Sequence, residues 1–260
     1  MIDMNTSEKM YHIQCQESDI GHYVLLPGDP GRVSEIAKRL EHAKRVASNR
    51  EYTTYTGYLD GVKVSVTSTG IGGPSAAIAL EELIKLGAHT FIRVGTCGGI
   101  DCSLEPGSLI IATGAIRKEG TTSEYIPIEF PAVGNFELLT ALNNAAHKLS
   151  HQSYLGIVES KDSFYGQHEP DQMPNAAILK QKWEAWKAGG ALASEMETSA
   201  LYIISAIRRV RCGSILLLIR NREKENLENT PPTMCDTNAH LLDTAVEGMR
   251  QIIRIDKEAQ

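Results

Sequence analysis

Runs of apolar and β-branched residues alternate along the chain with stretches whose apolar residues recur at helical spacing. The runs predict strands at 23–26, 51–59, 62–67, 90–94, 108–116, 154–159 and 212–219. The helical pattern predicts a short helix that ends near residue 40, and further helices at 74–86, 135–149, 178–187, 197–208 and 236–253. Strands that alternate with helices indicate a largely parallel sheet covered on both faces.

Turn residues separate these elements. Asp60-Gly61 lies between two predicted strands and is a strong hairpin signal. Pro74 suits the first turn of the helix that follows it. The polar segment 223–232 ends in two prolines, and we expect it to be a mobile loop.

Length and composition predict one globular domain over residues 1–260, because no linker or low-complexity tract interrupts the pattern. The net charge of -6 is spread along the chain, which disfavours a nucleic-acid partner. No signal peptide begins the chain, and the longest apolar runs are too short to cross a bilayer, so we expect no membrane partner. The five cysteines lack the spacing of a zinc site or a disulfide framework, and a cytoplasmic location fits.

Glycine-rich turns follow three of the predicted strands, at Gly28, 70–73 and 95–99. Ligands bind beyond the carboxyl ends of parallel strands, and exposed backbone N–H groups in such turns suit an anion. Any one of these turns could instead need glycine for backbone geometry alone. No dinucleotide or Walker fingerprint is present, so the anion is expected to be inorganic phosphate or a sugar phosphate.

Arginines accompany these turns. Arg32 follows the first one, Arg93 precedes the third, and Arg50 precedes a strand. A single arginine is usually a solvated surface charge, but Arg93 interrupts an apolar strand. An unpaired charge there would cost several kcal/mol, so Arg93 must have an anionic partner in the protein or in a ligand.

Two further stretches could recognise a nucleoside. The carboxylates of Glu195 and Glu197 could accept hydrogen bonds from the vicinal hydroxyls of ribose, although acidic residues are also favourable at a helix N-terminus. The segment 162–168 offers aromatic rings followed by an amide, which could read the edge of a pyrimidine. An ordinary polar turn would have the same composition.

In combination and in this order, these stretches resemble the uridine phosphorylase branch of the nucleoside phosphorylase family over nearly the whole chain. The matching stretches are 27–33, 48–55, 68–75, 93–96, 129–133, 164–167 and 195–197. The resemblance implies a single α/β domain whose central, mixed and partly barrel-like sheet is flanked by helices. It also implies a homohexamer arranged as a trimer of dimers, with active sites completed across the dimer interfaces.

The resemblance also implies a role for individual residues. Phosphate, the co-substrate, would be bound by Gly28, Arg32, Arg93 and Thr96, with Arg50 supplied by the neighbouring subunit. Ribose would be bound by His12, Glu195, Met196 and Glu197, and the base by Phe164, Gln167, Cys97, His168 and Asn221. No cofactor is required, but some relatives hold a potassium ion at positions that match Glu51, Ile71 and Ser75.

Phosphorolysis of uridine to uracil and ribose 1-phosphate needs no protein nucleophile, because phosphate itself attacks C1′. Arg93 and Glu197 are the expected catalytic residues, since they would orient phosphate and ribose. Purine-cleaving relatives have an aspartate where this chain has Asn221, and this difference favours a pyrimidine. A purine nucleoside phosphorylase, a hydrolytic nucleosidase and a non-catalytic nucleoside-binding protein are the alternatives.

One position departs from the family pattern. Glu169 stands where better-known uridine phosphorylases have a base-binding arginine. Lys161, His168 and Arg222 are candidates to stabilise the leaving base in its place. Lys161 is the best placed of the three, although a surface lysine at a strand end would fit the sequence equally well.

Overall fold

A ten-stranded mixed sheet forms the centre of the protein. The structure is a computed structural model that describes residues 9–235 and 238–259. Its strands are β1 (Tyr23–Pro27), β2 (Glu41–Asn49), β3 (Tyr52–Leu59), β4 (Val62–Thr67), β5 (Thr90–Gly99), β6 (Leu109–Lys118), β7 (Ala132–Val133), β8 (Ser153–Lys161), β9 (Ala193–Glu195) and β10 (Arg211–Arg220). The helices are α1 (Pro30–Ala37), α2 (Gly73–Lys85), α3 (Phe136–Lys148), α4 (Phe164–His168), α5 (Ala176–Ala188), α6 (Thr198–Arg208), α7 (Arg222–Glu228) and α8 (Ala239–Glu258).

Part of the sheet closes on itself. The strand order is β10-β6-β8-β9-β5-β1-β4-β3-β2, and β10 also pairs with β5, so β10, β6, β8, β9 and β5 form a ring. Strands β1, β4, β3 and β2 extend the sheet beyond β5 as an open wing. Parallel pairs such as β1–β5 and β6–β8 alternate with antiparallel pairs such as β5–β9 and β10–β6. The mixed, partly barrel-like α/β fold is therefore confirmed, whereas the expectation of a largely parallel sheet was too strong.

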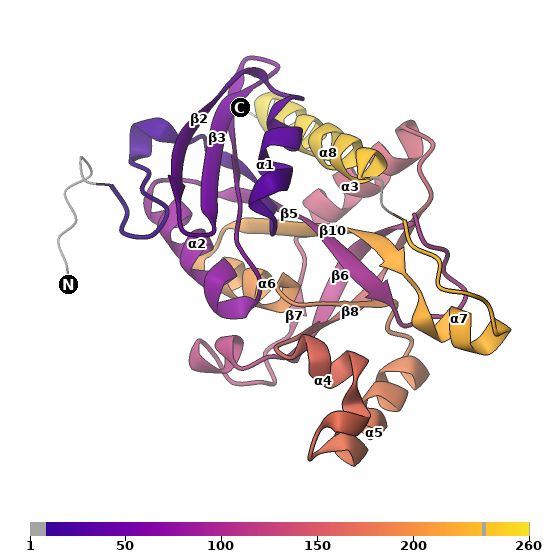
Figure 1. Ribbon diagram of the computed structural model, residues 1–260. Coiled ribbons are helices and arrows are strands. Elements are labelled where there is room, and N and C mark those ends of the chain that lie inside the picture. The colour runs from indigo at the N-terminus through magenta and orange to yellow at the C-terminus, as the bar shows by residue number, and fades with distance from the viewer. Residues whose placement is uncertain (1–8, 236–237, 260) are drawn as a thin grey trace.

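Helices cover the sheet on two sides (Figure 1). On one side α1, α3 and α8 contribute to one apolar cluster, in which α3 and α8 pack side by side. On the other side α2 packs against α6 in a second cluster. A third, smaller cluster fills the interior of the closed ring, where Cys97, Ile110, Val158 and Leu216 meet. Because these apolar clusters cover β5 and β10 on both faces, both strands have an almost continuous run of buried residues.

Most of the predicted elements are present, with ends shifted by a few residues. The hairpin at Asp60-Gly61 forms, with both residues at positive φ. The prediction of a loop over 223–232 was wrong for its first half, because α7 occupies Arg222–Glu228 with Asn221 as its N-cap. Helix α8 confirms the closing helix, of which residues 236 and 237 lie outside the described residues.

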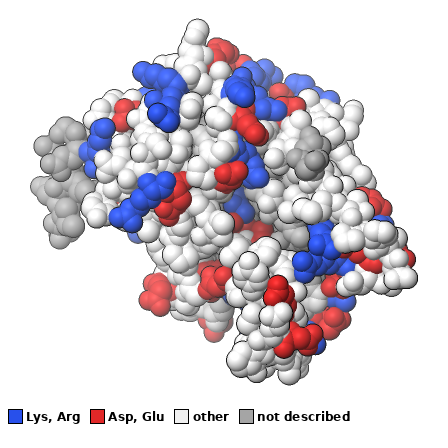
Figure 2. Space-filling model, in the orientation of Figure 1, with Lys and Arg blue, Asp and Glu red and all other residues white. Residues whose placement is uncertain are grey.

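Surface charge does not form a single-sign field on the face shown in Figure 2, where basic and acidic side chains are interspersed. Across residues 9–235 and 238–259, no helix is both long and apolar enough to cross a membrane. The interspersed charges on this face do not form the basic patch that binding to a polyanion requires.

Tyr202 tests how α6 is held against the closed ring. Its hydroxyl donates a 2.6 Å hydrogen bond to the carbonyl of Ala112, and the side chain is fully buried. We expect Tyr202→Phe to lower the free energy of unfolding by about 1–3 kcal/mol, because the buried carbonyl loses its donor. Thermal unfolding measures the change, and Tyr165→Phe, at an exposed tyrosine, is the matched control. Equal stability of the two variants would contradict this role.

Candidate functional site

A cavity of about 960 Å³ opens where several strands of the sheet end. Gly28 follows β1, Gly70 follows β4, and residues 95–99 form the last part of β5. The ends of β8, β9 and β10 contribute Lys161, Glu195 and Arg220. Helices α4, α5 and α7 supply the outer wall through Phe164, Gln167, His168, Trp183, Arg222, Glu223 and Asn226. The cavity lies at the edge of the sheet at which the glycine turns predict a ligand.

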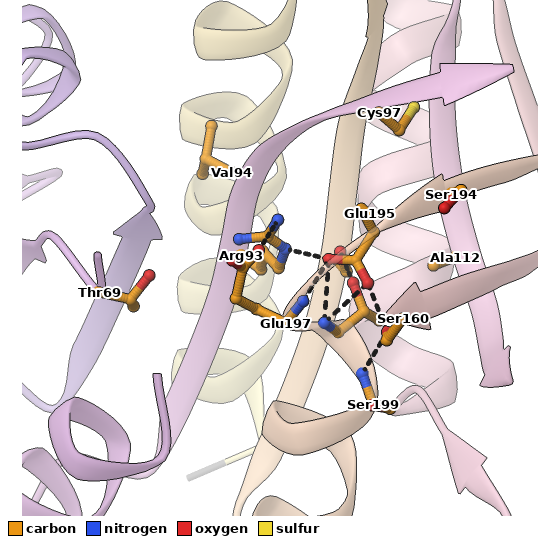
Figure 3. Close-up of polar contacts among 12 residues, drawn as sticks. Thr69, Arg93, Val94, Cys97, Ala112, Ser160, Ser194, Glu195, Glu197 and Ser199 are labelled. Atoms are coloured by element: carbon orange, nitrogen blue, oxygen red, sulfur yellow. Dashed lines mark hydrogen bonds and ion pairs between the residues drawn. The ribbon is translucent and has the colours of Figure 1, made fainter. Parts of the chain in front are cut away.

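Arg93 is the central charge of this cavity, and it is 3% exposed. Its Nε donates to Glu195 Oε2 over 2.9 Å, and its Nη2 lies 2.5 Å from Glu197 Oε2 (Figure 3). The sequence required an anionic partner for this buried arginine, and the protein supplies two. Nearby carboxylates raise the pKa of Arg93 against the opposing effect of burial, so the guanidinium stays charged.

Glu195 is held entirely by the protein. Its side chain is 0% exposed. Besides Arg93, it accepts hydrogen bonds from the backbone N–H groups of Glu197 and Thr198 and a short one from the Ser160 hydroxyl. The Ser160 hydroxyl in turn accepts from the N–H of Ser199 (Figure 3). Glu195 therefore fixes the turn between β9 and α6 and the orientation of Arg93.

Glu197 is the N-cap residue of α6 and lies between Arg93 and the glycine turn after β4. Its Oε1 accepts from the backbone N–H of Gly72 over 2.5 Å. Gly72 has φ +90°, a conformation that L side chains rarely adopt, so glycine is needed to aim this N–H. Burial raises the pKa of Glu197, and the charge of Arg93 opposes that shift.

Two arginine nitrogens in the cavity wall remain available to an anion. Arg93 Nη1 and Arg32 Nε are buried and have no hydrogen-bond partner within residues 9–235 and 238–259. Arg32 is anchored by Nη1, which donates to the carbonyl of Val94 over 3.3 Å. Burial lowers the pKa of Arg32, and the neighbouring charge of Arg93 adds to this effect. Gly28 and Thr96 line the same part of the cavity. One buried and one partly buried guanidinium group, each with a buried nitrogen that has no partner among the described residues, suit a phosphate group.

The other part of the cavity has aromatic and amide side chains. Phe164, Gln167 and His168 project from α4, and the rings of Phe164 and His168 lie 4.3 Å apart. Burial lowers the pKa of His168 to about 4, with further lowering by Arg222 and Lys161, so this imidazole is neutral near pH 7. Cys97 also lines this cavity, and burial raises the pKa of its thiol.

Lys161 is a buried residue, 4% exposed, and not a surface lysine. Its Nζ donates to the hydroxyl of Ser194 over 2.7 Å. Burial lowers the pKa of Lys161, while Glu159, Glu195 and Glu197 oppose the shift. A buried ammonium group in the cavity wall is therefore available to a ligand that gains negative charge.

Some predicted site residues do not line the cavity of this chain. Arg50 is exposed, with φ +52°, and His12 instead pairs with Glu82, whose Oε1 lies 2.6 Å from His12 Nδ1. Asn221 is 1% exposed and faces away from the cavity. Its amide nitrogen donates to the carbonyls of Asp101 and Leu104, and its oxygen caps α7. Direct contact of Asn221 with a base is thus not supported, because its hydrogen-bonding groups are used by the backbone.

The remaining predicted residues lie together. Met196 lines the cavity beside Glu195 and Glu197, and Arg222 lines it from α7. Glu51 and Ile71 also line it, and Ser75 donates to Glu51 Oε1 over 2.8 Å. In the part of the chain that the structure describes, no group of three or more His, Cys, Asp or Glu residues could hold a metal ion.

Sequence reasoning missed several residues that support the site. Glu159, Ser160 and Ser194 form buried hydrogen bonds beneath it, and Trp183 and Glu223 join α5 to α7 through a 2.8 Å hydrogen bond. The sequence did contain a sign of the buried hydrogen bonds on β8, because the polar residues 159–161 end a strand that is otherwise largely apolar. The link between Trp183 and Glu223 had no such signal, because it joins residues 40 positions apart.

Comparison with known proteins agrees with this geometry. The family model of the phosphorylase superfamily matches residues 22–251. Uridine phosphorylase of Treponema pallidum is 53% identical over 248 residues, which cover 95% of each chain. Uridine phosphorylase of Thermococcus kodakarensis is 45% identical over 84% of this chain and 79% of its own. Guanosine phosphorylase of Halorubrum lacusprofundi is 35% identical over 96% of this chain and 98% of its own. These matches, which run through every wall of the cavity, show that the chain belongs to the nucleoside phosphorylase family within the phosphorylase superfamily.

Proposed function

We propose that this protein cleaves uridine with inorganic phosphate to give uracil and ribose 1-phosphate, which makes it a pentosyltransferase of pyrimidine salvage. The observation that carries the proposal is the buried pair of Arg93 and Glu197, beside Arg93 Nη1 and Arg32 Nε, which have no partner in the part of the chain that the structure describes. Names of similar proteins support the choice of uridine, since the relatives from Treponema pallidum and Thermococcus kodakarensis are uridine phosphorylases.

The phosphate end of the cavity would position the nucleophile. Arg93 Nη1 and Arg32 Nε donate to phosphate oxygens, with Gly28 and Thr96 beside them. One phosphate oxygen forms a bond to C1′ of the ribose, while the bond from C1′ to N1 of uracil breaks and its electron pair stays on the base. Since the protein forms no covalent bond, its contribution is orientation and electrostatic stabilisation.

Glu197 is the residue we assign to ribose. Its carboxylate is fixed by Arg93 and by Gly72 N–H, and an ionised carboxylate has further lone pairs for the ribose hydroxyls. Met196 packs beside the sugar. Glu195 is better assigned as a positioning residue than as a ribose ligand, because its oxygens already accept from Arg93, from two N–H groups of the turn and from the hydroxyl of Ser160 on β8.

At the base end, Phe164 and Gln167 would hold uracil, with Cys97 and the neutral His168 beside it. The leaving uracil carries negative charge on its carbonyl oxygens. We propose that Lys161 stabilises this negative charge, because Lys161 is a buried cation in the cavity wall. The chain lacks the base-binding arginine of the family, so another cation is needed. Arg222, which donates to the carbonyl of His168 over 3.3 Å, is a second cation on this side.

A purine base fits this site less well. Both hydrogens of the Asn221 amide are donated to backbone carbonyls, so this position offers no proton to N7 of a purine. Purine cleavage nevertheless stays the second candidate, because the guanosine phosphorylase of Halorubrum lacusprofundi is 35% identical over nearly the whole chain. Phosphate dependence would be common to both.

The assembly, too, belongs to the proposal. A homohexamer built as a trimer of dimers would bring Arg50 and His12 of a neighbouring subunit to the phosphate and ribose, which fits their position outside the cavity of their own chain. A cytoplasmic location fits the salvage reaction. Glu51, Ile71 and Ser75 would provide oxygen ligands for potassium, and the close carboxylate and hydroxyl of Glu51 and Ser75 suit such a hard cation.

A panel of nucleosides tests the reaction directly. We expect uridine to release its base faster than thymidine, inosine or adenosine, and only when phosphate is present. Free base is measured by chromatography with and without phosphate. Uracil release that does not depend on phosphate would indicate hydrolysis, inosine as the best substrate would indicate a purine enzyme, and binding without release would indicate a non-catalytic protein.

Glu197→Gln tests the ribose assignment. The amide keeps the size of the side chain but loses the charge opposite Arg93 and the strong acceptor for a ribose hydroxyl. We expect kcat/KM for uridine to fall about 100-fold, since hydrogen bonds to charged groups contribute about 1.5–3 kcal/mol. 2′-Deoxyuridine should lose less than uridine. Glu81→Gln, which breaks an exposed pair with Arg208, is the control and should leave kcat/KM unchanged. Equal losses on both nucleosides would argue against a contact with the 2′-hydroxyl.

Lys161 gives a prediction about pH. Burial lowers the pKa of Lys161 from the usual 10.5. As the pH rises, Lys161 therefore loses its charge earlier than an exposed lysine would. Because the charged form stabilises the leaving base, kcat should decline as pH rises through this lowered pKa. Lys161→Ala should reduce kcat at neutral pH by about 100-fold, as for loss of a group that stabilises charge in the transition state.

The control for this profile is Lys118→Arg, which changes a second lysine that pairs with Glu159. It should retain both the neutral rate and the alkaline decline. In Lys161→Arg the decline due to this group should disappear, because arginine stays charged. A rate for Lys161→Ala within a few-fold of the unmodified protein would rule out the leaving-group role.

A further inference from the structure

Ser194 lies where three polar side chains meet at the base end of the cavity. Its Oγ is 2.7 Å from Lys161 Nζ, 2.6 Å from Glu159 Oε2 and 2.8 Å from Gln167 Oε1. Ser194 is 2% exposed, Lys161 4% and Glu159 0%. Polar groups buried to this degree are hydrogen-bonded, and these groups have one another as partners.

The hydrogens of this cluster can be counted. A serine hydroxyl has one hydrogen and two lone pairs. The ammonium group of Lys161 can only donate, so it uses one lone pair. The carboxylate of Glu159 can only accept, and its other oxygen lies 3.1 Å from a second ammonium group, that of Lys118. The single hydroxyl hydrogen of Ser194 therefore goes to Glu159.

This count fixes the orientation of Gln167. The remaining lone pair of Ser194 can only accept, so an amide oxygen at 2.8 Å would face another oxygen with no hydrogen between them. The oxygen and nitrogen of an amide have nearly the same shape, and the hydrogen-bond network decides between them. The amide nitrogen of Gln167 must then face Ser194, which leaves the amide oxygen and one N–H for the ligand.

We propose that Ser194, held by Glu159 and Lys161, is a positioning residue that locks the Gln167 amide in one orientation and so selects uracil over cytosine. This inference rests on the proposed cleavage of uridine. At N3, uracil is a donor and cytosine an acceptor, and at C4 uracil has an acceptor and cytosine a donor. A fixed amide oxygen that accepts from N3–H of uracil would face a lone pair of cytosine.

The lock matters because a free amide would not discriminate. By turning half a revolution, glutamine exchanges its acceptor and its donor and can match either base. In this cluster the turned amide would place its oxygen against Ser194 Oγ. The two oxygens would then both be acceptors with no hydrogen between them, which is unfavourable in a buried site. Sites whose buried polar groups would be left unpaired reject the wrong ligand strongly. Selectivity against cytidine thus depends on the hydroxyl of Ser194 and the carboxylate of Glu159, to which we assign no contact with the base.

Ser194→Ala is the direct test, with cytidine as a competitive inhibitor of uridine cleavage. Without the hydroxyl, the amide is free to turn. We expect the ratio of the cytidine Ki to the uridine KM to fall about tenfold or more, equivalent to the net loss of one typical hydrogen bond. The KM for phosphate should not change. Ser194→Thr keeps a hydroxyl and should restore the ratio. Ser205→Ala removes a buried hydroxyl outside the cavity and is the control.

Glu159→Gln provides an independent variant if Ser194→Ala does not fold. An amide at 159 can donate to Ser194, which frees the hydroxyl hydrogen for Gln167 and permits both amide orientations, so the ratio should fall here too. If the unmodified protein releases no uracil with phosphate, the proposed function fails. If it cleaves uridine but binds cytidine equally well, or if a folded variant keeps the original ratio, the lock is overturned while the proposed function stands.

Discussion

The buried charge of Arg93 is the interaction on which the rest of the site depends. A guanidinium group inside the protein is tolerated only when anions and hydrogen-bond acceptors surround it, since breaking such a pair costs several kcal/mol. Two carboxylates, from Glu195 and Glu197, meet this requirement. Glu195 is itself fixed by the turn that begins α6, so satisfying Arg93 also places Glu197 in the cavity. Among the described residues, Arg93 Nη1 has no partner, so this nitrogen remains for a ligand.

The closed part of the sheet is what makes this pairing possible. Strand β9 has only three residues, but it pairs with β8 on one side and with β5 on the other. That arrangement places Ser194 between Gly98 on β5 and Glu159 on β8, and it places Glu195 opposite Ser160 on β8. One short strand thus carries a residue of the arginine network and a residue of the lysine cluster. The two ends of the cavity, which we propose bind phosphate and the base, are therefore both connected to β9.

The sequence predicted what depends on local pattern and missed what depends on distant partners. Apolar strands and amphipathic helices were predictable, whereas β2 is polar because it lies at the sheet edge, and β9 is too short to show a pattern. The need of Arg93 for an anion was predictable from its apolar strand. Its pairing with Glu195, 102 residues away, was beyond spacing arguments. The hydrogen bonds of the Asn221 amide were also beyond the sequence, because only the fold brings the backbone carbonyls of Asp101 and Leu104 near it.

We propose that the network around Arg93 binds phosphate and ribose at the same time. A crystal structure with phosphate and an uncleavable uridine analogue is the decisive measurement. We expect a phosphate oxygen within hydrogen-bond distance of Arg93 Nη1 and of Arg32 Nε, and a ribose hydroxyl on Glu197. Phosphate bound elsewhere, with both arginine nitrogens still unused and Glu197 not touching the sugar, would contradict it.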